Sequence, residues 1–327
     1  MRYYSIQVNN ADGSTYRTFT SWANNKTDPG AQQIEFDVPV STLAIPDGAA
    51  IVKIVGVDLL TVAQGSDFNG KTIKVYGGFK PGLPLATLAS ERLQAGLLVS
   101  GLIIQGFGNW VGTQQYLELI IIADGRKSID TGLNIVLNWQ TGVKMQDAIT
   151  QTLQTALPGS TVTGTLSPNL VLAAPETGSY PSLQAFGYEM QRISRAILNP
   201  NGTSNYSGVS IQPVEGGFIL SDGTSATTPK QILYTDLIGQ PTYIGPGEMQ
   251  VIVAMRADIQ PTDYVTLPTT LVTIAPGDPT VPADRSQFQG TFRVVSARHV
   301  GNFREADALA WITVLNCSPL SASASAA

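Results

Sequence analysis

The strongest constraint on the fold is a two-residue alternation of apolar and polar side chains that recurs through residues 1–137. Successive side chains of a strand point to opposite faces, so this alternation is typical of half-buried strands. Residues 34–40 (Ile-Glu-Phe-Asp-Val-Pro-Val) show it most plainly, and Asp12-Gly13 supplies a hairpin turn between residues 4–8 and 16–19. We find no helical periodicity here, which predicts an antiparallel β-barrel or sandwich.

Two glycine-containing segments interrupt this pattern, Gly77-Gly78 and Gly106-Phe-Gly-Asn109. No helical pattern follows either one, so we interpret them as β-bulges or tight turns rather than as phosphate-binding loops. Further strands of the same region are predicted at residues 50–60, 71–76, 98–105 and 116–123.

The apolar period then changes to that of a helix. Apolar residues between Met145 and Leu157 fall on one helical face, and Pro158-Gly159 ends the helix. A second helix is predicted from Pro181, a favoured first-turn residue, to Leu198. Short strands at residues 208–212 and 217–220 complete a small α+β segment.

Residues 237–316 return to strand-forming sequence. Residues 250–256 are rich in β-branched side chains, and the turn at 260–263 precedes a strand at 264–267. Two more strands are expected to follow and to end at Trp311. We therefore predict a mainly β chain, in which a small α+β domain joins two antiparallel β-barrel or sandwich domains. The predicted divisions are residues 1–137, 138–236, 237–318 and a disordered low-complexity tail at 319–327.

Charged residues are scarce, at 13% of the chain against about 25% in an average globular protein. This composition suggests a β-rich protein whose surface is hidden in an assembly, with a monomer of neutral polar surface as the alternative. The net charge of −5 and the isolated basic residues argue against a sequence-specific nucleic-acid binder, which needs a basic stripe to neutralise phosphates. The longest apolar run, Leu119–Ala123, is too short for membrane insertion, and we expect no signal peptide.

Candidates for catalytic chemistry are few. Cys317 and His299 are each the only residue of their kind, which excludes an intrachain disulfide framework and a multi-histidine metal site. His299 and Arg298 are neighbours on a predicted strand, so one of them faces the core. Arg256 and Asp258 share one face of another predicted strand, where they could form an ion pair or offer charges to a neighbouring subunit. We expect no enzyme activity, no cofactor and no metal.

Six segments of the C-terminal half follow one another in a specific order and spacing, although each alone is weakly specific. They are preceded by Trp139-Gln-Thr-Gly142 before the first helix and Pro181-Ser-Leu183 at the second. Together these motifs resemble the baseplate hub proteins of tailed bacteriophages over nearly the whole chain. The six segments are Asp236–Tyr243, Met255–Ile259, Asp263–Pro268, Phe288–Phe292, Val295–Arg304 and Trp311–Val314.

The resemblance implies that the two β domains are barrel-like relatives of tail-tube subunits. Three chains would then close into a ring of pseudo-sixfold symmetry, which adapts the sixfold tail tube to the threefold central spike. It also implies contacts with other baseplate proteins, a place in the virion of a contractile tail, and assembly in the host cytoplasm. DNA would pass through the lumen, which an acidic balance suits because like charges repel.

The same resemblance directs attention to eight interface or structural candidates. A different ring component, such as a distal-tail or tube-initiator protein, is one alternative function, and a cell-wall-cleaving β enzyme is another. The copy number of the assembly separates the ring components, because a hub forms trimers and a tube-like protein forms hexamers. The eight interface or structural candidate residues are Gln240, Pro241, Arg256, Asp258, Arg298, His299, Arg304 and Trp311.

Overall fold

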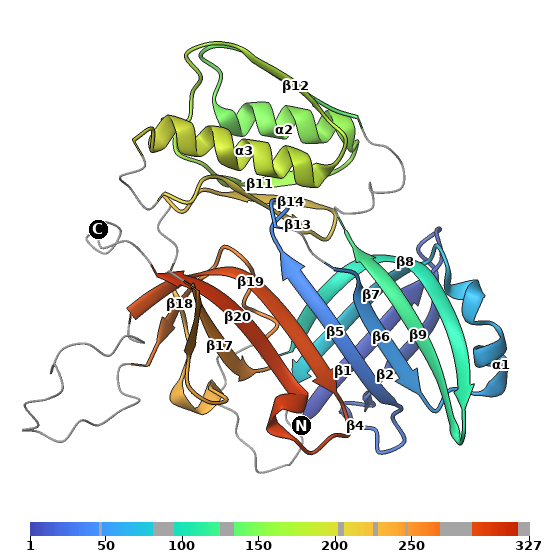
Figure 1. Ribbon diagram of the computed structural model, residues 1–327. Coiled ribbons are helices and arrows are strands. Elements are labelled where there is room, and N and C mark those ends of the chain that lie inside the picture. The colour runs from blue at the N-terminus through green and yellow to red at the C-terminus, as the bar shows by residue number, and fades with distance from the viewer. Residues whose placement is uncertain are drawn as a thin grey trace, which may run out of the picture.

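One largely antiparallel sheet of 13 strands runs through most of the chain (Figure 1). Its strands surround two cores, in a first β unit (residues 1–124) and a second β unit (residues 228–319). A middle unit (residues 134–224) with two long helices lies above them and has a core of its own. The computed structural model describes residues 1–45, 48–80, 95–124, 134–201, 206–224, 228–245, 248–268 and 290–319.

The first β unit holds seven strands, paired antiparallel in the order β5–β6–β9–β8–β7–β1–β2. The predicted alternation is confirmed in β5, where Ile34, Phe36 and Val38 are buried. A small hairpin of β3 (Trp22–Ala23) and β4 (Lys26–Thr27) follows the second strand. The seven strands are β1 (Arg2–Asn9), β2 (Thr15–Thr20), β5 (Gln33–Ser41), β6 (Ala50–Val55), β7 (Thr72–Phe79), β8 (Gly96–Val111) and β9 (Gln114–Ala123).

The second β unit holds the other six strands of the sheet. Four of them follow the order β16–β17–β20–β19, while β18 pairs with β19 and, in parallel, with β15. Two short 3-10 helices belong to this unit, η3 (Tyr234–Asp236) and η4 (Ala308–Ala310). The strands are β15 (Lys230–Gln231), β16 (Thr242–Gly245), β17 (Glu248–Ala254), β18 (Tyr264–Leu267), β19 (Gly290–Asn302) and β20 (Trp311–Pro319).

Strands β5 and β19 join the two β units edge to edge (Figure 1). Their antiparallel register runs from Ser41 opposite Ser296 to Glu35 opposite Asn302. Side chains from the second β unit also cross this seam, because Met255, Ala257 and Trp311 are buried in the core of the first β unit. The two cores are therefore connected by a continuous sheet and by shared packing.

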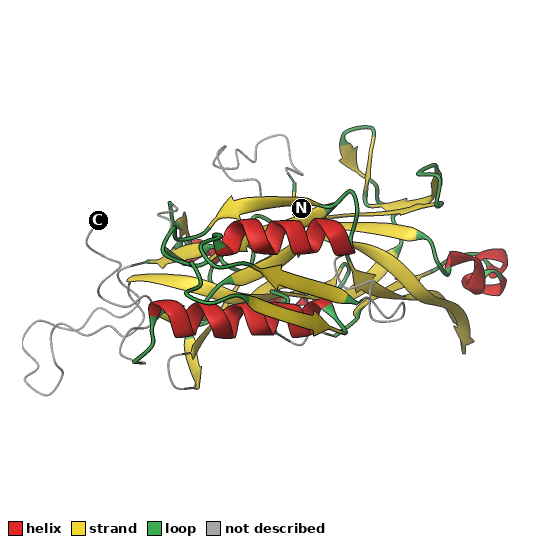
Figure 2. Cartoon of the chain, turned by 90° about the horizontal axis from the view of Figure 1, so that it is seen from above, coloured by secondary structure: helices red, strands yellow, loops and turns green. Residues whose placement is uncertain are grey.

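The middle unit combines two small sheets with two helices that lie side by side when the chain is seen from above (Figure 2). Residue Leu43, which follows β5, is buried in its core, and the Leu43 N–H donates to the carbonyl oxygen of Ile211 at 2.8 Å. This insertion fastens the middle unit to the β sheet. Its elements are β10 (Ile135–Trp139), α2 (Met145–Ala156), β11 (Thr161–Thr165), β12 (Glu176–Tyr180), α3 (Leu183–Leu198), β13 (Ser210–Val214) and β14 (Gly217–Ser221).

The predicted fold class is confirmed: the chain is mainly β, with an α+β middle segment. Strand β10 spans the predicted division at residue 137, and both Ile135 and Leu137 pack in the middle core. The second β unit begins at β15, before the predicted residue 237. Of the predicted tail at 319–327, only Pro319 lies within the described residues. No helix in the described part of the chain is long and apolar enough to cross a membrane.

The prediction of a first β unit without helices, with a strand at residues 50–60, was wrong after Val55. The expected strand at 50–60 ends at Val55, and helix α1 (Leu59–Ala63) and 3-10 helix η1 (Gly65–Phe68) follow. The cause is local, because Gly56 has a φ of +82° and an Asp58 side-chain oxygen accepts the Thr61 N–H at 2.7 Å. A helix of five residues is too short to produce a 3.6-residue pattern.

The segment Gly106–Asn109 is neither a bulge nor a turn, as it continues strand β8. Helix α1 crosses it so closely that a Cβ on Gly108 would lie 2.1 Å from the carbonyl oxygen of Val62. Gly77 and Gly78 also lie within a strand, β7, beside a register shift between Val75 and Tyr76. The glycines at 106 and 108 therefore serve close packing of a helix against a strand.

Three predicted element boundaries also differ from the structure. Helix α3 begins at Leu183 instead of Pro181, because the Ser182 hydroxyl caps it by accepting the Ala185 N–H at 3.2 Å. Trp311 begins strand β20, whereas the sequence predicted that a strand ends there. Strand β17 ends at Ala254, so Arg256 and Asp258 lie in the irregular segment that follows it and not on a strand.

Candidate functional site

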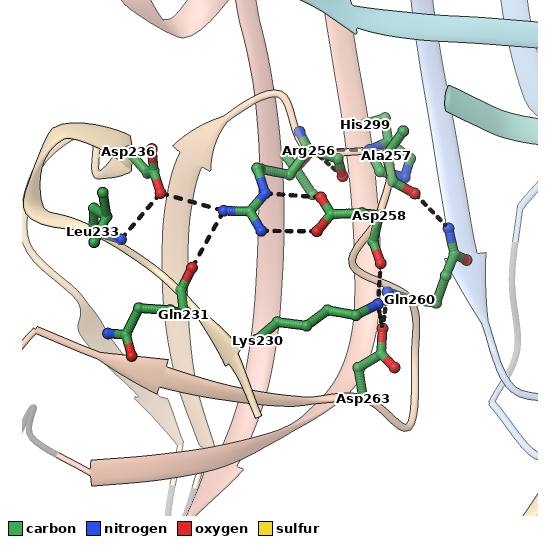
Figure 3. A network of polar contacts seen from close by, with 11 residues as sticks. Lys230, Gln231, Leu233, Asp236, Arg256, Ala257, Asp258, Gln260, Asp263 and His299 are labelled. Atoms are coloured by element: carbon green, nitrogen blue, oxygen red, sulfur yellow. Dashed lines mark hydrogen bonds and ion pairs between the residues drawn. The ribbon is translucent and has the colours of Figure 1, made fainter. Parts of the chain in front are cut away.

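The buried Arg256 lies at the centre of a network of charged side chains in the second β unit (Figure 3). Its Nε and Nη2 each donate to a carboxylate oxygen of Asp258 at 2.8 Å, which makes a bidentate pair. Its Nη1 lies 3.2 Å from Oδ2 of Asp236, so one guanidinium joins two carboxylates. Of the two interpretations of Arg256 and Asp258, the internal ion pair is the one that the structure contains.

Asp236 and Gln231 connect this network to the start of the second β unit. The Oδ2 of Asp236 accepts the Leu233 N–H at 3.0 Å and thereby closes the turn of η3. Arg256 Nη1 also donates to the carbonyl oxygen of Gln231 in β15, at 3.4 Å. Arg256 therefore holds η3 and β15 against the segment that follows β17.

Lys230 extends the network to the predicted turn at residues 260–263. Its Nζ lies 2.6 Å from Oδ2 of Asp263 and also donates to the carbonyl oxygen of Asp258. The same Asp263 oxygen accepts the Gln260 N–H at 2.7 Å, and the Asp263 N–H donates to the Gln260 carbonyl oxygen at 3.1 Å. The carboxylate thus stabilises its own turn, as Asp often does.

Arg256 and Asp258 stabilise the charged forms of each other. Burial by itself would raise the pKa of Asp258, but the hydrogen bonds and charge of Arg256, with the charge of Lys230, outweigh burial and lower this pKa. The hydrogen bond to Asp258 raises the pKa of Arg256 against the opposing effect of burial. Both partners are therefore charged at neutral pH, and their chemistry is to hold segments together rather than to transfer a proton.

His299 is fully buried on β19, beside the backbone of Arg256. Its Nδ1 lies 2.9 Å from Oγ1 of Thr313, and the same hydroxyl accepts the Arg256 N–H at 3.0 Å. Burial lowers the pKa of His299 to about 4, so the imidazole is neutral at neutral pH. The prediction that His299 and Arg298 lie on opposite faces of a strand is confirmed, because His299 faces the interior and Arg298 faces solvent.

Arg298 forms an exposed ion pair with Asp37 across the seam between the two β units. Its Nε lies 2.7 Å from Oδ1 of Asp37, and its Nη2 pairs with the other oxygen. Both side chains are solvent-exposed, at 59% and 40%. Arg298 therefore lies at the junction of β19 and β5, away from the Arg256 network.

Trp311 is a core residue of the first β unit, although it belongs to a strand of the second. Its Nε1 donates to the carbonyl oxygen of Gly78 in β7 at 2.9 Å. Its ring meets the rings of Phe36 and Phe303 edge-on, at centroid distances of 5.1 and 6.1 Å. Trp311 thus ties β20 to the other β unit.

The remaining candidates do not join any of these groups. Gln240 is exposed and Pro241 is buried in the connection before β16. Arg304 is exposed, and its Nη2 donates to the carbonyl oxygens of Pro29 and Ala31. The eight sequence candidates are therefore brought together only in part, around Arg256, Asp258 and His299.

Sequence reasoning missed Arg293, which lies between the second β unit and the middle unit. Its Nη2 donates to Oγ of Ser210 at 3.0 Å and its Nη1 to Oγ of Ser207. Burial lowers the pKa of Arg293. Three successive residues, 292–294, are buried here because the middle unit covers the second face of the strand. The alternation of apolar and polar residues predicts burial on one face of a strand only, so it cannot predict a residue such as Arg293 on a strand that is buried on both faces.

A cavity of about 350 Å³ opens where the three units meet. Its wall is mainly apolar, with Val40, Leu98 and Ala257 among its lining residues. Glu215 also lines it and forms an ion pair with Lys74 at 2.6 Å. Within the described ranges, no three His, Cys, Asp or Glu side chains lie close enough together to hold a metal ion.

The sequence matches no protein-family model and no curated protein, but solved structures share its fold. The tail protein from Neisseria meningitidis MC58 has a TM-score of 0.54 at 12% identity, with 97% of this chain and 96% of that one covered. The 43 kDa tail protein of prophage MuSo2 from Shewanella oneidensis has a TM-score of 0.53 at 8% identity, with 97% and 96% covered.

A third similar structure comes from a secretion system. The E. coli c3393 protein is a component of the type VI secretion system with structural similarity to the T4 bacteriophage tail proteins gp27 and gp5. It has a TM-score of 0.52 at 8% identity, with 89% of this chain and 74% of that one covered. The chain therefore has the fold of phage tail proteins, in agreement with the resemblance found in its sequence.

Proposed function

We propose that the chain is a structural ring component of a phage tail and that three copies form its baseplate hub. The observation that supports this most directly is the pairing of β5 with β19, which places two β units side by side in one continuous sheet. Three such chains would arrange six units around one axis. The fold shared with the Neisseria tail protein and the prophage MuSo2 tail protein, over nearly their full length, supports the tail assignment.

In this proposal the partners follow from the symmetry of the ring. Six β units meet the sixfold tail tube or a tube-initiator protein, and the threefold repeat of the chain meets the central spike. Other baseplate proteins surround the ring in the virion, after assembly in the host cytoplasm. The net charge of −5 favours passage of DNA through the lumen without specific binding, because like charges repel.

The proposed role is mechanical and not catalytic. A general acid or base must lie within hydrogen-bond reach of its substrate. His299 is fully buried, and the Arg256 guanidinium is bonded to Asp258 and Asp236. These side chains fit the task of keeping the second β unit rigid inside an assembly.

The test is the mass and symmetry of the purified protein. Analytical ultracentrifugation should give a trimer, and electron microscopy of the same sample should show a ring of six similar densities around a channel. A hexamer would favour the distal-tail or tube-initiator alternative, and a stable monomer that cleaves cell wall would refute both ring functions. A channel lined mainly by Lys and Arg would contradict the proposed passage of DNA.

A further inference from the structure

The main strand order of the sheet ends at β16 and at β2, and a side branch through β18 ends at the two-residue strand β15. Strand β16 pairs with β17 alone and β2 pairs with β1 alone, as far as the described residues extend. Strands at the end of a sheet are the ones at which association with another chain is favoured. These two edges belong to different β units, so they lie at opposite ends of the strand order.

Large apolar side chains are exposed beside the β16 edge. Two of them lie at η3 and two on β16 itself. Strand β16 pairs with β17, and Leu237, which follows η3, forms a bridge with Val253 of β17. We term this group the β16 end. Its members are Leu233 (41% exposed), Tyr234 (66%), Tyr243 (45%) and Ile244 (48%).

A second group of exposed apolar side chains lies beside the β2 edge. Arg17 of β2 contacts helix α1, where it donates to Thr61 Oγ1 and lies 3.4 Å from the Asp58 carboxylate. Helix α1 in turn packs on β8 near the tip of the β8–β9 hairpin. We term this group the α1 end. Its members are Leu59 (52% exposed), Leu60 (66%), Trp110 (63%) and Val111 (64%).

The elements that carry the two groups lie far apart in the fold. Helix α1 lies at the right-hand edge of Figure 1, on the far side of the first β unit from β17. Each group exposes roughly 400 Å² of apolar side chain, which is as large as the largest patch of a typical monomer and is often functional. Together with the flanking edges, two such surfaces in contact approach the roughly 1,200 Å² that a specific interface needs.

We propose that the α1 end of one copy docks on the β16 end of the next copy. The two surfaces differ in residues and position, so the contact is heterologous, and such contacts close into rings when the rotation allows. This inference rests on the proposed ring function and names the surfaces that would build it. The exposed apolar residues of the middle unit, such as Val136 and Tyr188, belong to neither end.

The test uses one charged variant at each end and a matched control. Leu60→Lys places a charge in the α1 end and Tyr234→Lys in the β16 end, while Tyr188→Lys alters a tyrosine of α3 that is 59% exposed. Circular dichroism and thermal unfolding should show that all three fold, because each side chain is exposed. Sedimentation equilibrium should show association weakened by about tenfold or more for the first two variants only.

Mixing the two end variants provides the decisive result. Leu60→Lys keeps an intact β16 end and Tyr234→Lys keeps an intact α1 end, so an equimolar mixture should form dimers that grow no further. A wild-type trimer whose two end variants also remain trimeric would overturn the inference and leave the ring intact. A wild-type protein that is monomeric would instead count against the proposed ring function itself.

Discussion

The two β units belong to one sheet, yet they fill their interiors differently. The core of the first is apolar, and the aromatic rings of Phe36, Phe303 and Trp311 meet edge-on within it. The second has an apolar core too, but Arg256 with its carboxylates and the neutral His299 are buried beside it. The comparison shows that one sheet can be stabilised by non-directional packing on one side of a seam and by directional polar contacts on the other.

Strand length explains the difference. The first β unit contains strands of up to sixteen residues, whose ladders fix their neighbours. In the second, β15 has two residues and β16 has four, so their few ladder bonds leave their positions weakly determined. The contacts of Arg256 and Lys230 tie the shorter of the two, β15, and the neighbouring η3 to the segment that follows β17. Breaking each kind of contact in turn tests this account.

Removing the Trp311 side chain should lower the free energy of unfolding most, because it is the largest side chain at the seam between the two β units. We expect Trp311→Ala to lower the free energy of unfolding by about 3–5 kcal/mol through lost burial and the cavity left behind. Chemical denaturation measures this directly. Tyr188→Ala is the control, since Tyr188 is 59% exposed, belongs to neither the α1 end nor the β16 end and should cost less than about 0.5 kcal/mol. Equal costs for the two variants would contradict the packing account.

Acidification should weaken the second β unit through His299. Its pKa is about 4 in the folded protein against an ordinary value of 6.5, so below pH 6.5 the unfolded chain binds a proton that the folded chain does not. The free energy of unfolding should therefore be at its full value above pH 6.5 and decline by about 3 kcal/mol as the pH falls to 4.

Thermal unfolding across this pH range measures the decline. His299→Gln is the variant to compare, because its amide can still bond Thr313 but does not titrate. The variant should lose most of the slope between pH 6.5 and 4. An unchanged slope would show that other groups cause it.

Breaking the buried ion pair should have a moderate effect. Asp258→Asn removes the charge that faces Arg256 but leaves Asp236 in place, so we expect a loss of about 2 kcal/mol, measured by chemical denaturation. Because the pKa of Asp258 is lowered in the fold, its contribution is complete above the ordinary pKa of Asp and is lost as the pH falls through the lowered value. A loss that persists unchanged at lower pH would argue against a charge effect.

The exposed ion pair between Arg298 and Asp37 should contribute least to the free energy of unfolding. Arg298→Ala should cost less than about 1 kcal/mol, because both partners are solvent-exposed and water screens their attraction. A denaturation curve in high salt should show the wild type and the variant converging. A cost of several kcal/mol would mean that the seam depends on this pair more than on β5–β19 backbone bonding.

Most of the secondary structure follows from periodicity. Strands such as β5 and the helices α2 and α3 have one buried face, which leaves a period of two or 3.6 residues in the sequence. Helix α1 could not be found in this way, since five residues do not complete two turns. Asp58, three residues before Thr61, was the available signal, because its carboxylate caps that helix.

The candidate site was predictable only where its residues are neighbours in the chain. Arg256 and Asp258 are two residues apart, and their opposite charges in an apolar context already suggested an ion pair. Asp236 and Lys230 are 20 and 26 residues from Arg256, and no pattern in the sequence relates them to it. Arg293 is hidden in the same way, since the unit that covers it is distant in sequence.

The sequence by itself determined the class of fold, the number of long helices and the placement of His299 and Arg298 on opposite faces of a strand. Each of these depends on which face of a local element is buried, and burial leaves a periodic trace in the chain. The tertiary structure alone decided that β5 pairs with β19, that Trp311 enters the other core and that the main strand order runs from β16 to β2. Strand partners are chosen by contacts between distant residues, and such contacts leave no period in the sequence.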